Sequence, residues 1–81
     1  MSSLQYIIDT MCSSVTVDCV YQMIEALIEE GPFIEADLIP LIQTKDRSLD
    51  SESAKTIAKA ALNDMAQRGI VRIAGDKISR V

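Results

Sequence analysis

Apolar side chains recur at helical spacing along most of the chain, and the period changes to that of strands near the C-terminus. Over residues 3–11 the apolar positions follow i, i+3, i+4, i+7, which predicts a short amphipathic helix. A second apolar stripe predicts a helix over residues 17–30, with Thr16 as its N-cap. The Gly31-Pro32 pair is expected to end this helix.

The middle of the chain predicts a short extended piece at residues 33–34, a third helix over 35–43 and a polar connection over 44–50. Pro40 leaves two alternatives open for the third helix. A helix that begins at Ala36 loses a backbone hydrogen bond at the proline and is kinked there. A helix that begins late has Pro40 near its first turn.

The strongest helical pattern covers residues 51–68, with Asp50 or Ser51 as its N-cap and Gly69 as its end. Its apolar positions repeat at a period of 3.6 and predict a buried stripe. That stripe consists of Ala54, Ile57, Ala58, Ala61, Leu62 and Met65.

Residues 70–73 and 77–81 are β-branched runs on either side of a Gly75-Asp76 turn. A two-residue turn there predicts a hairpin that pairs Ile73 with Ile78 and Arg72 with Ser79. An isolated hairpin is marginal, so we expect it to lie against the helices or to pair with the strand at residue 33.

These elements predict a mainly α fold with a small antiparallel β-hairpin, an α+β class. The 81 residues suffice for one domain, and 48% apolar and 25% charged residues are typical of a folded globule. We expect a single domain over 1–81, with an N-terminal helix in 1–14 ahead of the main body in 16–81.

Residue usage argues against an enzyme and against a bound metal or cofactor. The chain has no histidine, and therefore lacks the commonest general base and zinc ligand. Cys12 and Cys19 are seven positions apart and form no C-x-x-C motif, and no glycine-rich phosphate loop is present. No apolar run approaches the roughly 20 residues of a membrane span, and no basic region precedes an apolar run at the N-terminus, so we expect a cytoplasmic protein.

Charge is strongly segregated along the chain. Residues 1–43 carry seven acids and no base, whereas residues 44–81 carry all eight bases and five acids, so the halves have formal charges of −7 and +3. The asymmetry predicts one acidic and one basic surface on the folded domain.

Two stretches resemble the winged helix-turn-helix superfamily. The opening of such a domain is similar to VYQMIEALIEEGPFIEADLIPLI, in which an apolar helix ends at Gly-Pro and another helix follows. Its close is similar to AKTIAKAALNDMAQRGIVRIAGDKISRV, in which a recognition-type helix ends at Arg-Gly before a strand, a tight turn and a return strand. The resemblance covers residues 17–81 and identifies a superfamily, not a protein.

The resemblance implies a small transcriptional regulator that reads duplex DNA with the 51–68 helix and a short C-terminal wing. Carried over by position, base contacts would come from Ser53, Lys55, Thr56, Lys59 and Asn63. Phosphate contacts would come from Lys45, Arg47, Arg72, Lys77 and Arg80. Lysine can bind phosphate or guanine, and asparagine can bind adenine through two hydrogen bonds.

The acidic first half of the chain, its low overall pI and Glu52 favour an alternative, an acidic protein-interaction (adaptor) module on the same scaffold without DNA binding. Glu52 lies on the same helix face as the lysines, and Asp76 lies in the turn of the short wing. Arg68 stands near a helix C-terminus, where it favours the helix dipole over a DNA contact.

The first helix leaves two roles open. Its apolar side chains could cover the domain core, or they could form a self-complementary patch in a homodimer on a symmetric DNA site, and of the two we expect the homodimer. The residues concerned are Leu4, Tyr6, Ile7, Ile8 and Met11.

Overall fold

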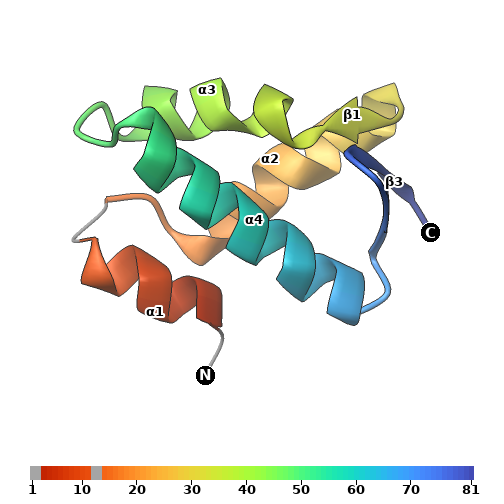
Figure 1. Cartoon of the computed structure of the whole chain (residues 1–81), viewed down its shortest axis with the longest axis horizontal. Helices are drawn as coiled ribbons and strands as arrows, with labels where there is room; N and C mark the ends of the chain where they lie inside the picture. The colour runs from red at the N-terminus through yellow and green to blue at the C-terminus, as the bar shows by residue number, and fades with distance from the viewer. Residues whose placement is uncertain (1–2, 12–13) are drawn as a thin grey trace.

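A computed structural model describes residues 3–11 and 14–81, and within them the chain forms four helices and three strands (Figure 1). The helices are α1 (Ser3–Thr10), α2 (Val17–Glu30), α3 (Glu35–Lys45) and α4 (Ser51–Gln67). The strands are β1 (Phe33–Ile34), β2 (Val71–Ala74) and β3 (Lys77–Arg80). The structure confirms the predicted class, a mainly helical chain with a small antiparallel sheet, and the predicted order of elements.

Local capping explains why α2 begins and ends where it does. The Thr16 side chain accepts a hydrogen bond of 3.1 Å from the backbone N–H of Cys19, which satisfies one of the free donors of the first turn. At the other end Gly31 adopts a positive φ of 132° and donates its N–H to the carbonyl of Ile28. Both predicted boundaries of this helix are confirmed.

Pro40 lies inside α3, and the late start of this helix is wrong. The helix begins at Glu35, where the carboxylate of Asp37 accepts a hydrogen bond of 3.3 Å from the N–H of Ile34. The proline has no N–H to donate to the carbonyl of Ala36, so the helix lacks one backbone hydrogen bond there, and both residues are exposed. The helix continues to Lys45, two residues beyond the predicted end.

The sheet has the strand order β1-β3-β2, and all its pairs are antiparallel. β2 pairs with β3 in the predicted register, with Ile73 opposite Ile78 and Arg72 opposite Ser79. The two-residue turn requires a positive φ, which Gly75 supplies at 64°. The predicted contact with the strand at Phe33 is also confirmed, because Phe33 lies opposite Ile78.

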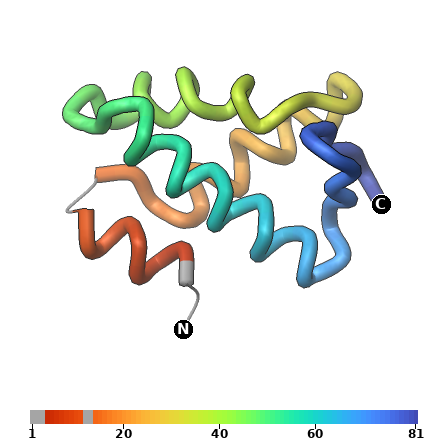
Figure 2. Tube along the Cα trace, in the orientation of Figure 1, coloured from red at the N-terminus to blue at the C-terminus, as the bar shows by residue number. Residues whose placement is uncertain are grey.

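α4 crosses the centre of the molecule and packs against α1, α2, α3 and β2 (Figures 1 and 2). Every residue of its predicted stripe is buried, and Ala60 is buried as well. Four of the buried residues of α4 are alanines, whose small side chains let the neighbouring helices approach closely.

α1 covers part of the same core. Leu4 and Ile8 are buried among the core residues, and Ile7 and Met11 are partly buried against them. Tyr6 alone of the predicted patch is strongly exposed, at 66%. The core-covering role is therefore the one that the structure gives to Leu4 and Ile8.

A buried carboxylate holds the connection between α3 and α4. The side chain of Asp46 accepts hydrogen bonds from the N–H of Ser14 at 3.0 Å, and from the N–H and hydroxyl of Ser48 at 3.1 and 2.6 Å. Asp46 is 8% exposed, and no other polar or charged residue in the described part of the chain is buried. Because Ser14 precedes α2, this carboxylate ties two connections that are 32 residues apart.

Replacement of Asp46 by alanine leaves three donors without their acceptor, and we expect a loss of about 2–4 kcal/mol in the free energy of unfolding. Urea denaturation measures the loss. The matched control, Ser48→Ala, removes one hydroxyl and is expected to cost only about 1 kcal/mol. Equal midpoints and slopes for wild type and Asp46→Ala would show that the carboxylate does not hold the connection.

Candidate nucleic-acid interface

One side of α4 is uncovered by the rest of the fold. We call it the exposed strip of α4, and it consists of Glu52, Lys55, Thr56, Lys59 and Asn63. Glu52, Lys55, Lys59 and Asn63 lie three or four residues apart and line up along the helix, with Thr56 beside them. Ser53, predicted to join them, is half-buried beside the strip. The hydroxyl of Thr56 is engaged within the helix, since it donates a hydrogen bond of 2.9 Å to the carbonyl of Glu52.

A cleft separates the C-terminal half of this strip from the hairpin, and we call it the α4–hairpin cleft. Its volume is about 370 Å³. Its walls come from the start of α3, from α4 and from the hairpin: Glu35, Lys59, Leu62, Asn63, Ile73, Gly75, Asp76 and Ile78. The cleft thus brings two predicted DNA contacts, Lys59 and Asn63, to the side of the wing turn.

Two carboxylates share the α4–hairpin cleft with Lys59. Asp76 belongs to the turn, and Glu35 arrives through the pairing of β1 with β3, which places Ile34 opposite Lys77. A phosphate group in this cleft would meet more negative than positive charge. Residue spacing did not predict that Glu35 lies in this cleft, because its position there depends on the pairing of two strands that are distant in the sequence.

Lys45 and Arg47 lie at the other end of α4. Lys45 is the last residue of α3, and Arg47 belongs to the connection at residues 46–50, which leads directly into the first turn of α4 (Figure 1). Both side chains are exposed. Among the described residues the one ion pair joins Arg68 to Asp64, so neither Lys45 nor Arg47 has a carboxylate within 4.0 Å.

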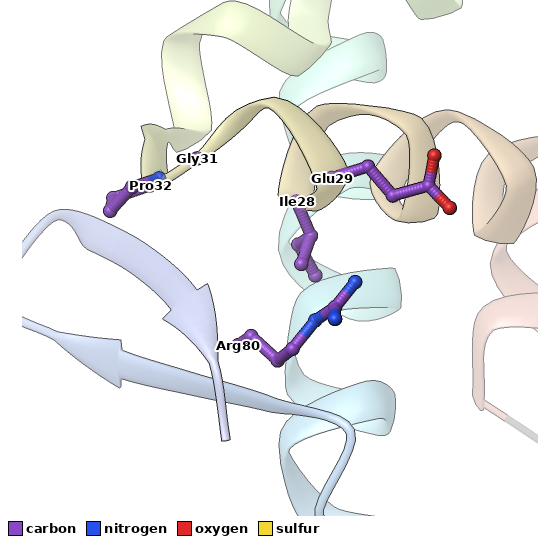
Figure 3. Close-up of a pocket in the computed structure, with 5 residues that line it drawn as sticks. All are labelled: Ile28, Glu29, Gly31, Pro32 and Arg80. Carbon is purple, nitrogen blue, oxygen red and sulfur yellow. The ribbon is translucent and has the colours of Figure 1, made fainter.

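The predicted contacts of the hairpin divide between two faces of the sheet. Alternation along the strands puts Arg72 and Lys77 on the outer face, because their neighbours Val71 and Ile78 point into the core. Arg80 shares the face of Ile78 and lies beside Ile28 and the C-terminal end of α2 (Figure 3). Because Ile73 and Ile78 line the cleft with Lys59, the outer face of Arg72 and Lys77 is turned away from α4, whereas Arg80 lies at the other end of β3 beside α2. The structure therefore brings none of these three basic residues together with Lys59.

Arg68 is engaged within the chain. Its Nε lies 3.4 Å from a carboxylate oxygen of Asp64, and its guanidinium lies 5.8 Å from the ring centroid of Tyr21. These contacts tie the end of α4 to α2. The interpretation of Arg68 as a stabiliser of its helix end agrees with this position.

The exposed apolar remainder of α1 adjoins the strip. Tyr6, Ile7, Thr10 and Met11 line a hollow of about 130 Å³ together with Thr56 of α4. Leu4 and Ile8 take no part, because the core covers them. A patch between two copies would therefore have to form on fewer side chains than the sequence predicted.

Asp50 fixes the first turn of α4 and thus the start of the strip. Its carboxylate accepts a hydrogen bond of 2.8 Å from the backbone N–H of Ser53. That bond, with a further one from the Ser53 side chain, lowers the pKa of Asp50 below its ordinary value, because both favour the charged form.

Because its pKa is lowered in the folded chain, Asp50 stabilises the fold at pH values above the ordinary pKa of a carboxyl group. The stabilisation begins to fall as the pH drops below about 4, where the carboxyl group of the unfolded chain takes up a proton, and it is lost once the pH passes through the lowered pKa of the folded chain. Asparagine also caps a helix but does not titrate. We therefore expect the free energy of unfolding of Asp50→Asn to fall less at low pH than that of the wild type. Urea denaturation of both chains from pH 7 to pH 2 measures it. Parallel stability curves down to pH 2 would contradict the assignment.

None of the protein-family models, curated proteins or solved structures compared with the chain matches it. In the described ranges 3–11 and 14–81, no helix is both long and apolar enough to cross a membrane. The same residues contain no group of three or more histidine, cysteine, aspartate or glutamate side chains that could hold a metal ion. Cys19 is a half-buried free thiol, and Cys12 lies outside the described residues.

Proposed function

We propose that the chain binds duplex DNA as a small winged-helix protein, with the exposed strip of α4 in the major groove. The observation that carries the proposal is the placement of Lys55, Lys59 and Asn63 in line on the one uncovered side of α4. Neither lysine has a carboxylate within 4.0 Å, so both ammonium groups are free to meet phosphate or guanine. A transcriptional regulator is the role that best suits such a domain.

The arrangement of α2, α3, α4 and the hairpin supports the proposal. A helix that follows a helix-turn-helix connection, with a hairpin beside its end, is how winged-helix domains present a recognition helix. The connection at 46–50 is longer than the three or four residues of a compact turn. It adds Arg47 beside Lys45 at the N-terminal end of α4, where both can reach the DNA backbone.

The acids of the α4–hairpin cleft limit the footprint. Glu35 and Asp76 repel phosphate near the hairpin turn, so we assign phosphate contacts mainly to Lys45, Arg47 and Lys55, and base contacts to Lys59 and Asn63. A homodimer through α1 stays a prediction, and its contact would have to form mainly on Tyr6, Ile7 and Met11, because Leu4 and Ile8 are buried. A standard interface needs about 800 Å² from each partner.

A second candidate function is the binding of a protein through the α4–hairpin cleft. Its mixture of Glu35, Asp76 and Lys59 with Ile73, which is 39% exposed, favours this alternative. Mixed charges around an apolar side chain are typical of protein interfaces rather than of phosphate sites.

Fluorescence anisotropy with a labelled 30-base-pair duplex, from 25 to 200 mM NaCl, tests DNA binding. We expect Lys55→Ala/Lys59→Ala to weaken binding at least about tenfold at the lowest salt concentration. The slope of log K against log salt should fall by about two if both lysines contact phosphate. The single variant Lys59→Ala is compared with Arg80→Ala, which removes one positive charge away from the proposed DNA contact. Arg80→Ala should change the affinity for DNA little.

A further variant separates the two candidates. Glu35→Gln/Asp76→Asn removes the negative charge from the α4–hairpin cleft and should raise DNA affinity several-fold if DNA approaches α4 from this side. Absence of binding by wild type at 25 mM NaCl would exclude DNA as the ligand. Equal losses from Lys59→Ala and Arg80→Ala would exclude α4 as the contact.

A further inference from the structure

A groove runs between the C-terminal half of α2 and the end of the hairpin, and we call it the α2–hairpin groove. Figure 3 shows Ile28 and Pro32 from the α2 side, and Arg80 reaching from β3 toward Ile28. The hollow between these three side chains has a volume of about 610 Å³. A smaller hollow of about 210 Å³ adds Glu25 and Ile70, and because both share Ile28, Glu29 and Arg80, they form one continuous groove.

The floor of the α2–hairpin groove is apolar and incompletely covered. Ile28 is almost buried at 8% exposure, whereas Ile70 is 40% exposed, and Pro32 is exposed at the end of the groove. An apolar side chain from outside would therefore remove the surfaces of Ile28 and Ile70 from water.

The α2 side of the groove is acidic and has no compensating base. α2 contains acids but no lysine or arginine, and Glu25 and Glu29 form no ion pair within the described residues. In Figure 3 the carboxylate of Glu29 extends along α2 away from Pro32, whereas Arg80 reaches from β3 toward Ile28 with its guanidinium at the far end. The two walls thus carry opposite charges without a contact shorter than 4.0 Å.

We propose that the α2–hairpin groove binds a basic amphipathic segment of another protein. One apolar side chain of the segment covers Ile28 and Ile70, and its lysine or arginine residues pair with Glu25 and Glu29. Arg80 sets the orientation, because it repels basic residues from the hairpin wall and confines them to the α2 wall.

A second copy of the chain fits this groove poorly. Across a two-fold axis the acids of one α2 would face those of the other, and like charges at an interface oppose association. The groove also uses none of the residues assigned to DNA. α2 passes behind α4 in the view of Figure 1, so a bound segment would leave the exposed strip of α4 uncovered.

The probe for this proposal is a labelled 14-residue peptide of leucine and lysine, with leucines at i, i+3, i+4 and i+7. Its affinity is measured by anisotropy at 100 mM NaCl, and its position by the amide shifts of the ¹⁵N-labelled chain. We expect the largest shifts at Ile28, Ile70 and Arg80. Glu25→Gln/Glu29→Gln should weaken binding about fivefold, the effect of losing two exposed ion pairs.

Arg80→Gln keeps most of the side chain and removes the repelling charge, so it should strengthen binding about two- to threefold. The control Glu35→Gln/Glu52→Gln makes the same charge change outside the groove and should leave the affinity within twofold. Equal weakening by the control, or shifts spread over all acidic residues, would overturn the proposal. DNA binding should be unaffected by Glu25→Gln/Glu29→Gln, so failure of the groove and failure of the DNA interface give different results.

Discussion

The close packing of α4 is the constraint on which the rest of the structure depends. Its alanines Ala54, Ala58 and Ala61 are fully buried, and small side chains at these positions allow other helices to lie against α4. α1, α2, α3 and β2 all pack on this helix. A helix covered on so many sides has one uncovered strip, and the residues of that strip, not the net charge of −4, decide what the domain can recognise.

Long-range pairing sets the charge around that strip. β1 is only two residues long, yet its pairing with β3 carries the acidic start of α3 to the side of the hairpin turn. The segregated charges of the sequence therefore do not become two uniform faces. At the N-terminal end of α4 the bases Lys45 and Arg47 stand among the acids Asp46, Asp50 and Glu52. Acids enter the cleft at the other end, and the outer side of α2 carries acids without a base.

Local signals in the sequence predict the elements well, because they act within a few residues. Thr16 caps α2, and Gly75 permits the turn that fixes the register of the hairpin. Pro40 was ambiguous because a proline removes one backbone hydrogen bond inside a helix but none near its start, and the structure contains it inside α3.

Relations between distant segments could not be predicted in the same way. Spacing identified Lys55, Lys59 and Asn63 as one exposed row. It grouped the bases of the hairpin with them, although strand alternation turns Arg72 and Lys77 away from α4 and Arg80 lies at the end of β3 beside α2. The buried Asp46 gave no signal, since its partner Ser14 lies 32 residues away.

The most direct test of the account is an amide-shift titration of the ¹⁵N-labelled chain with a duplex at 50 mM NaCl. The account predicts shifts along residues 45–63, with the C-terminal half of α2 unchanged; shifts confined to α2 and the hairpin would contradict it.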